Sequence, residues 1–548
     1  MKKDKIDINT SKEVFVNTEN KKSKKRKRGD ELEDVMDVEK AEKSTRKLSD
    51  KMEKMDISDE SEEILSESDP DEEVLVDEGH DDDSDDYMEE EGAEKPEKNK
   101  NLKVNVWDEK TKLEEGQELD FDNEAYEMLH RAKVEWPCMT IDFLLPENFY
   151  PPVKNFYEKK TNQINDTYPY TCYMVAGSQT TSANGFLYYM KWYNMQKTKY
   201  DDDPDKGAES DEEEAKEPFL KFEKIQVKGN INRVKSMKNS YLTAFWSDSP
   251  SIEICDMRSL IEDLEGNSEE YKEGKIKKKR KIDSRNIMLK SFQRNVEGFA
   301  LEWSALSPGV LAAGGQDKKI EIYIPTDESY SSWIINSENA NNNYGILKGH
   351  KSSIEDIIWS PVQAHVLASC SVDKSIRFWD LRVEKNSAPI VIDSAHESDV
   401  NCISWNPFCD FMIASGGDDH AFKVWDIRYI SNGPISNIQW HKGPITALSW
   451  DPYEDSQLAV SSEDNRLSIW DFAVEPDDTH LFDASNQEIP QQLIFLHQGQ
   501  ENIKDLKFHP HYRNFLVSTA ENGINVFKPA FDDEDSINDE EEEMYVDN

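Results

Sequence analysis

Short apolar runs alternate with polar turn residues through the second half of the chain, and this pattern repeats with a regular period. Three stretches of similar length carry it most clearly, and they begin at Gly349, Ala395 and Trp440. Each stretch contains apolar runs of strand length, such as Ser375–Trp379 and Phe422–Trp425, separated by turn residues. The pattern therefore predicts short β-strands, grouped into one small sheet in each stretch.

The three stretches share a histidine near the start and a tryptophan near the end. Both residues recur at intervals of 46 and 45 residues: His350, His396 and His441, then Trp379, Trp425 and Trp470. A period of about 40–45 residues with Gly-His near one end and Trp-Asp at the other is the signature of a β-propeller blade. Since one such sheet is too small to bury its own faces, several must pack around a common axis.

Four further stretches match the same unit more weakly. They are Leu496–Pro529, Asn295–Pro325, Gly229–Met257 and Tyr168–Trp192. With the three strong copies they make seven units, so the sequence predicts an all-β, seven-bladed WD-repeat propeller over residues 147–529. The isolated apolar run Trp136–Leu145 is predicted to be a strand that closes the ring by pairing with the last blade.

An aspartate precedes each of the three tryptophans by six residues. In the WD-repeat family such an aspartate pairs with the histidine of its blade, and a serine and the tryptophan complete the contact. The predicted blade ties are His350, Ser369, Asp373 and Trp379; His396, Asp419 and Trp425; and His441, Asp464 and Trp470. We expect the third tie to be incomplete, because Val460 stands where the first copy has Ser369.

A histidine, a serine and an aspartate could instead form the catalytic triad of a hydrolase. A nucleophilic triad is needed once in a protein, whereas this set recurs in every strong copy. The recurrence favours a structural role, since buried polar groups have to be paired. The chain also has no phosphate-binding loop and no H-E-x-x-H or G-x-S-x-G motif. We therefore expect no enzyme activity, no cofactor and no metal.

Apolar residues also recur at helical spacing just before the propeller. The pattern predicts a helix over Asp120–Pro137, with Asp122 as its N-cap and Pro137 as its end. Residues 116–146 would thus contain an N-terminal helix followed by the closing strand. The helix either docks on the propeller alone or also binds a partner.

Negative charge is concentrated in three tracts of the chain, whose formal net charge is −47. Asp56–Glu91 holds 20 acidic residues, Asp201–Glu217 holds ten acidic and two basic residues, and Asp532–Glu543 holds nine acidic residues. The tracts together carry −37, which leaves −10 for the rest of the chain. Such tracts are either solubilising segments or sites that attract a strongly basic partner.

The regions outside the blades are predicted from composition. Residues 1–115 and 530–548 are expected to be disordered, because they have few aromatic residues and long runs of charge. Residues 200–217 form a predicted acidic insert between the first two blades, and residues 258–288 a basic insert between the second and third. The six cysteines form no C-x-x-C pair, and no apolar run reaches the length of a membrane span. We expect reduced cysteines and no membrane association.

A basic cluster near the N-terminus predicts nuclear import. Its core residues are Lys24, Lys25, Arg26, Lys27 and Arg28. A patch for nucleic acid is the alternative, but the acidic tract beside it would repel phosphates. A second cluster, Lys275–Lys281, is either another import signal or a counterweight to the acidic segments. Ser66, Ser68 and Ser210 each have an acidic residue three positions later, which suits an acid-directed kinase.

The order of elements resembles the histone-binding WD proteins of the chromatin-assembly type. Within that superfamily the chain is most similar to the glutamate-rich WD-repeat proteins, whose fungal member is a ribosome-assembly factor. The stretches that carry the resemblance are Asn230–Ser236, Glu297–Ser304, Lys351–Pro361, Ile489–Gly499 and Phe515–Gly523. The loop Ser485–Gly499 departs from the histone-binding pattern, because it lacks the Pro-Pro pair and the dense acidic residues.

The resemblance implies a nuclear and nucleolar chaperone of large ribosomal subunit assembly. Its partners would be a newly made basic ribosomal protein and pre-ribosomal particles, with histones as a further candidate and no direct sequence-specific contact to nucleic acid. The candidate partner-binding residues are Phe121, Tyr126, Leu129, Glu488, Pro490, Leu493, Glu89, Glu90 and Glu91. One alternative is a histone-binding chromatin-assembly protein. Another is a cullin ubiquitin-ligase receptor, indicated by the W-D-x-R motifs Trp379–Arg382 and Trp425–Arg428.

Overall fold

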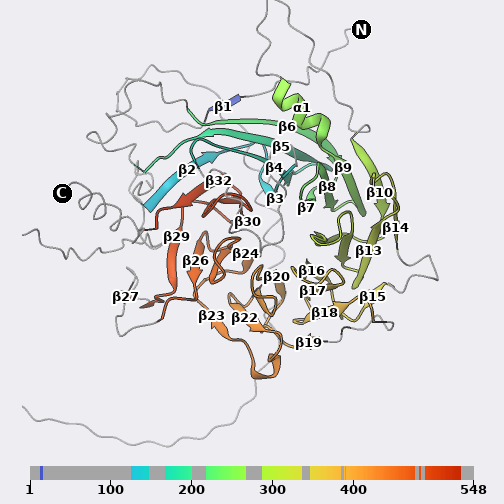
Figure 1. The fold of residues 1–548 in the computed structure, drawn as a ribbon, viewed down its shortest axis with the longest axis vertical. Coiled ribbons are helices and arrows are strands. Elements are labelled where there is room, and N and C mark those ends of the chain that lie inside the picture. The colour runs from blue at the N-terminus through green and yellow to red at the C-terminus, as the bar shows by residue number, and fades with distance from the viewer. Residues whose placement is uncertain are drawn as a thin grey trace, which may run out of the picture. The chain divides into compact units, whose positions relative to one another are not determined.

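Seven antiparallel sheets surround a common axis in the computed structural model of the chain (Figure 1). The structure describes residues 13–15, 125–146, 167–199, 217–266, 287–335, 346–383, 388, 390–475, 481–482 and 488–531. The innermost strand of each sheet contacts the innermost strand of the next, and the last contacts the first, so the sheets form a closed ring. The predicted seven-bladed WD propeller is confirmed.

The first three blades are described from the axis outward. Blade 1 has β3 (Cys138–Phe143), β4 (Tyr170–Ser178), β5 (Asn184–Met195) and β6 (Phe219–Lys228), and β1 (Glu13–Phe15) pairs with β6. Blade 2 has β7 (Ile231–Ser236), β8 (Leu242–Ser247), β9 (Ser251–Asp256) and β10 (Met288–Gln293). Blade 3 has β11 (Gly298–Trp303), β12 (Leu311–Gly315) and β13 (Lys319–Pro325), and both β14 (Trp333–Ile335) and β15 (Leu347–Lys348) pair with β13.

The next three blades contain the strong sequence repeats. Blade 4 has β16 (Ile354–Trp359), β17 (Val366–Ser371), β18 (Ile376–Asp380) and β19 (Ile390–Ile392). Blade 5 has β20 (Val400–Trp405), β21 (Met412–Gly417), β22 (Phe422–Asp426) and β23 (Ser436–Ile438), with a 3-10 turn at Ile430–Asn432. Blade 6 has β24 (Ile445–Trp450), β25 (Gln457–Ser462), β26 (Leu467–Asp471) and β29 (Leu493–His497). A small hairpin of β27 (Leu481–Phe482) and β28 (Glu488–Ile489) precedes β29.

The last blade joins the two ends of the propeller. Blade 7 has β30 (Asp505–Phe508), β31 (Leu516–Ala520) and β32 (Gly523–Pro529), and its outer strand is β2 (Tyr126–Ala132), from the N-terminal side of the chain. Figure 1 shows β2 lying beside β32 although nearly four hundred residues separate them. The ring is therefore closed by backbone hydrogen bonds between the first and last strands of the propeller.

The predicted N-terminal helix is wrong over Tyr126–Ala132, because these residues form β2. Leu129 and the run Tyr126, Met128, His130 and Ala132 are all buried, so both faces of the strand are covered and no clean alternation marks it. Pairing with β32 supplies the tertiary contacts that override the helical spacing. The start of the predicted helix, including Phe121 and Asp122, lies outside the described residues.

The predicted closing strand is also wrong in its partner. Residues Cys138–Phe143 form β3, which pairs with β4 as the innermost strand of blade 1 and does not pair with the last blade. The ring is closed one strand earlier in the chain, by β2. An apolar run that belongs next to the axis and one that closes the ring look alike in sequence, because both are buried on two sides.

Both predicted inserts lie inside blades, not between them. The acidic insert connects β5 to β6, the third and fourth strands of blade 1. The basic insert connects β9 to β10 in blade 2, and its first residues form the helix α1 (Arg258–Gly266). This helix packs on blade 1, where Glu265 pairs with Lys191 at 2.8 Å. The acidic residues 201–216 and the basic cluster Lys275–Lys281 lie outside the described residues.

Candidate functional site

The predicted blade ties are present in the three blades with strong repeats. In blade 4 the His350 Nδ1 atom lies 3.0 Å from an Asp373 carboxylate oxygen, and its Nε2 atom lies 2.8 Å from the Ser369 hydroxyl. The Trp379 indole donates to the same hydroxyl at 2.8 Å. Blade 5 repeats the arrangement with His396, Asp419, Ser415 and Trp425. All these groups connect strands within one blade, which is a structural role.

The tie of blade 6 is complete, so the expectation drawn from Val460 is wrong. The His441 Nε2 atom lies 2.8 Å from the Ser468 hydroxyl, which also accepts from the Trp470 indole at 2.7 Å. Ser468 is on β26 and supplies from the third strand the hydroxyl that Ser369 supplies from the second strand in blade 4. The same point in space can thus be filled from a neighbouring strand.

Two weaker blades hold the same place with other residues. In blade 3, Arg294 pairs with Asp317 and with Glu321, both at 2.9 Å. In blade 7, His497 lies 2.8 Å from the Tyr126 hydroxyl and 3.1 Å from the Asn525 amide. Because Tyr126 belongs to β2, the tie of blade 7 also secures the closing strand. Tyr126 and Leu129 are therefore buried parts of this closure.

One end of the propeller is organised by a bond that recurs in every blade. The residue that opens the turn between the second and third strands donates its backbone N–H to a carbonyl in front of the innermost strand, at 2.8 to 3.2 Å. From blade 1 to blade 7 the donor and acceptor pairs are Gln179 and Pro137, Asp248 and Asn230, Gln316 and Glu297, Val372 and Ser353, Asp418 and Asp399, Glu463 and Pro444, and Glu521 and Glu501. This repetition brings the same two positions of every blade to the same end of the ring.

Acidic residues occupy many of these positions. We call this end the acidic face and define it by Asp248, Glu297, Glu355, Asp399, Asp418, Glu463, Glu501 and Glu521, of which Glu355 is the second residue of β16. Four of its carboxylates accept hydrogen bonds from neutral side-chain amides, as Asp418 does from Asn401 at 2.7 Å. Lys504 pairs with Glu463 at 3.1 Å. Neutral amides leave the negative charge of the face largely in place.

The carboxylates near blades 4 and 5 repel one another. Burial raises the pKa of Glu355, and Asp399 and Asp356 raise it further against the opposing effects of Ser353 and Arg233. Burial and the charge of Asp418 likewise raise the pKa of Asp399. A cationic group placed here would relieve this repulsion. The face is therefore suited to bind a basic polypeptide.

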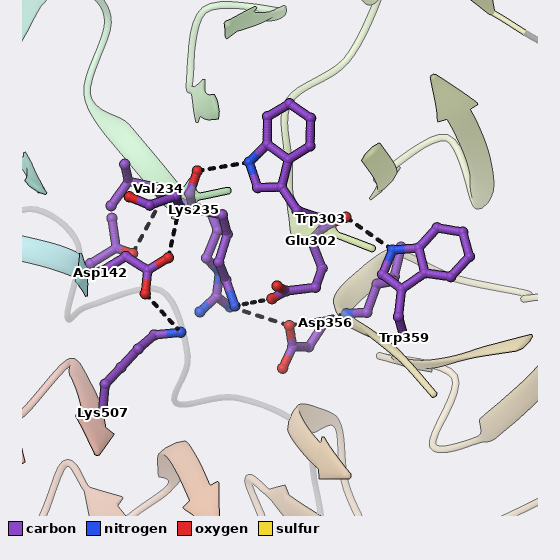
Figure 2. A network of polar contacts seen from close by, with 12 residues as sticks. Asp142, Val234, Lys235, Glu302, Trp303, Asp356, Trp359 and Lys507 are labelled. Atoms are coloured by element: carbon purple, nitrogen blue, oxygen red, sulfur yellow. Dashed lines mark hydrogen bonds and ion pairs between the residues drawn. The ribbon is translucent and has the colours of Figure 1, made fainter. Parts of the chain in front are cut away.

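The opposite end of the axis holds a different site, which we call the axial hollow. It has a volume of about 230 Å³, and Trp303, Trp405, Trp450, Phe508, Lys238 and Lys507 are among its lining residues. An ion network lies beneath it (Figure 2), in which Lys507 approaches Asp142 at 3.6 Å and Lys235 pairs with Glu302. The indoles of Trp303 and Trp359 donate to the backbone carbonyls of Lys235 and Glu302 in the preceding blades. The network joins neighbouring blades.

The predicted partner-binding residues fall into three groups. Glu488 is exposed, Pro490 is half-buried, and Leu493 packs partly against the core of blade 6. The structure brings this loop towards β2, because the rings of Phe495 and Tyr126 are 5.3 Å apart. The remaining candidates lie outside the described residues, as do the import cluster and the predicted phosphorylation sites: Phe121, Glu89, Glu90, Glu91, Lys24, Lys25, Arg26, Lys27, Arg28, Ser66, Ser68 and Ser210.

Sites of two other classes are absent from the described residues. No group of three or more histidine, cysteine, aspartate or glutamate residues in this part of the chain could hold a metal ion. No helix in the same part is long and apolar enough to cross a membrane. The cysteines among these residues form no disulfide.

Two family models match the chain. Residues 116–196 match the model of histone-binding protein RBBP4, or the corresponding component of the CAF1 complex. Residues 341–380, 388–426 and 432–471 match the WD domain, G-beta repeat. The first match covers β2, which closes the ring, and most of blade 1, and the second covers the three blades with complete ties.

Three known proteins are similar over most of the chain. Glutamate-rich WD repeat-containing protein 1 of Dictyostelium discoideum is 40% identical over 77% of this chain and 84% of its own length. Protein HEAT STRESS TOLERANT DWD 1 of Arabidopsis thaliana is 32% identical over 76% of this chain and 89% of its own. Ribosome assembly protein rrb1 of Schizosaccharomyces pombe is 30% identical over 76% of this chain and 83% of its own. The chain belongs to the family of glutamate-rich WD repeat-containing proteins.

Proposed function

We propose that this protein is a non-enzymatic assembly factor of the large ribosomal subunit. It binds a newly made, strongly basic ribosomal protein and delivers it to pre-ribosomal particles in the nucleus and nucleolus. The acidic face is the observation that carries the proposal, because it presents eight carboxylates from six blades at one end of a rigid ring. The name of the fungal relative, a ribosome assembly protein, supports the same function.

The acidic face and the acidic tracts have different tasks in this proposal. The tract Asp56–Glu91 has 20 acidic residues and few apolar ones, so it attracts any polycation and cannot distinguish one from another by shape. The blades hold their carboxylates in fixed positions through backbone bonds, so they recognise a particular arrangement of basic side chains. We therefore assign capture to the tracts and selection to the face.

Two other partners are candidates because specific observations favour them. The match of residues 116–196 to a histone-binding model favours histones, which are also strongly basic. The guanidinium groups of Arg382 and Arg428 are 58% and 52% exposed and pair with Asp380 and Asp426 within their own motifs. These exposed W-D-x-R motifs favour a ubiquitin-ligase adaptor.

Affinity purification of the tagged protein from cells separates the three partners. We expect one basic protein of the large ribosomal subunit, together with pre-ribosomal factors, as the principal companions. Histones with chromatin-assembly factors, or ligase adaptors without ribosomal proteins, would contradict the proposal. The matched comparison is a tagged Arg382→Ala, Arg428→Ala variant, which should retain the ribosomal companions.

A further inference from the structure

The axial hollow lies at the end of the ring where the innermost strands finish. Trp303 ends β11, Trp405 ends β20, Trp450 ends β24 and Phe508 ends β30, and all four line the hollow. The acidic face lies where these strands begin. An innermost strand of six residues spans about 20 Å, so the two sites are separated by the length of the axis.

The hollow combines aromatic and proline walls with positive charge at its edge. Pro407, Pro452 and Pro510 each stand two residues after a lining aromatic side chain. Lys238 is exposed at the edge, and Lys507 lies half-buried beside it. The two carboxylates of the lining already have strong donors: Asp142 accepts from the Ser236 backbone at 2.7 Å and from Lys507, and Glu302 pairs with Lys235. The hollow is thus suited to a segment that carries both apolar and acidic side chains.

The C-terminal tail of the chain starts at this same end of the ring. In blade 7, Phe508 of β30 is opposite Leu516 of β31, and Leu516 is opposite Phe527 of β32. Phe527 therefore stands two strand spacings, about 10 Å, from a residue that lines the hollow. The chain continues to Phe531, where the described residues end.

The sequence of the tail matches the lining of the hollow. Residues Asp532–Asn548 number 17, and at about 3.3 Å per residue they can reach about 55 Å. Asp532–Glu543 contains nine acidic residues and no basic one, and Met544, Tyr545 and Val546 follow directly. A run of carboxylates next to an aromatic and two aliphatic residues is complementary to lysines beside tryptophan and proline walls.

We propose that the C-terminal tail docks in the axial hollow of its own propeller. Tyr545 and its apolar neighbours enter between the aromatic and proline walls, and the adjoining carboxylates face Lys238 and Lys507. Docking is favoured by the high effective concentration that the short connection to β32 imposes. It holds the nine carboxylates of the tail at the end of the axis away from the acidic face, so they do not compete with that face for a basic client.

The test uses the full chain with a fluorescent dye attached after Asn548, and it measures the steady-state anisotropy of the dye. We expect a high anisotropy for the unaltered chain at low salt and a fall towards that of a free tail at 1 M salt. Lys238→Glu should weaken docking about fivefold, because it reverses one exposed ion contact, and Tyr545→Ala should release the tail. Lys442→Glu makes the same charge change at an exposed lysine at the opposite end of the axis and should leave the anisotropy unchanged.

A second measurement identifies the occupant of the hollow. A zero-length carbodiimide reagent joins carboxylates to lysines that touch them, and mass spectrometry of the full chain locates the joined residues. We expect Lys238 or Lys507 to be joined to acidic residues between Asp539 and Asp547. Joining of these lysines to Asp56–Glu91 instead, or an anisotropy equal in the unaltered chain and the Lys238→Glu and Tyr545→Ala variants, would overturn the proposal.

Discussion

Replacing Met128 by aspartate is expected to open the propeller ring. Met128 is fully buried in β2, between the cores of blades 7 and 1. A carboxylate there has no cationic partner and loses its hydration, which costs about 3–5 kcal/mol of the free energy of unfolding. Because β2 is the outer strand that joins the first and last parts of the propeller, the loss affects the whole ring. Chemical denaturation followed by tryptophan fluorescence measures the change.

The control for this prediction makes the same substitution at an exposed neighbour. Lys133 follows β2 directly and its side chain is exposed, so Lys133→Asp should change the free energy of unfolding by less than about 0.5 kcal/mol. Similar destabilisation by both variants would mean that the added negative charge, and not the burial of Met128, is responsible. A Met128→Asp variant as stable as the unaltered protein would show that β2 does not close the ring in solution.

The second large effect concerns the tie of blade 5. Asp419→Ala should lower the free energy of unfolding by about 1–3 kcal/mol, because it leaves the buried His396 without its partner. Asp393→Ala removes an exposed carboxylate near the same blade and is the matched control. In blade 6, Ser468→Ala should also destabilise the protein, whereas Val460→Ser should bring no gain because the hydroxyl position is already filled. Thermal melting compares the four variants.

The effect of Asp419→Ala should depend on pH in a defined direction. Burial raises the pKa of Asp419, but the hydrogen bond and the charge of His396 lower it more, to about 2 from an ordinary value of 3.8. A carboxyl group whose pKa is lowered by folding stabilises the protein above its unfolded value and loses that effect as the pH falls through the folded value. The melting temperatures of the two proteins should therefore converge between pH 4 and about pH 2. A constant difference over this range would exclude an ionised Asp419 as the cause.

The repeat pattern was enough to predict the seven blades, because each blade needs its own apolar strands and turn residues. The ties of blades 4 and 5 were predictable for the same reason: their histidine, aspartate and tryptophan keep fixed spacings. The tie of blade 6 was missed because sequence spacing ranks residues along one strand. Ser468 occupies the position from an adjacent strand, which only the register of β25 with β26 reveals.

The closing strand could not be identified from local sequence. Residues Tyr126–Ala132 satisfy helical spacing, and their strand conformation depends on β32, which is formed near the other end of the chain. The acidic face was missed for a different reason, since attention to the dense tracts hides acidic residues spread singly over the blades. A signal was present: Asp418 and Glu463 each stand directly before a tie aspartate, at the turn position that the recurring backbone bond brings to one end of the ring.

The binding of a basic client by the acidic face can be tested most directly by charge removal. The measurement is the affinity of the purified full chain for the basic large-subunit protein recovered from cells, compared between two variants that each lose three exposed charges. Asp418→Asn, Glu463→Gln and Glu521→Gln alter the acidic face, whereas Glu328→Gln, Glu454→Gln and Glu475→Gln alter exposed sites away from it. We predict about tenfold weaker binding for the first variant and unchanged binding for the second. Equal affinities of the two variants would contradict the assignment of client selection to the acidic face.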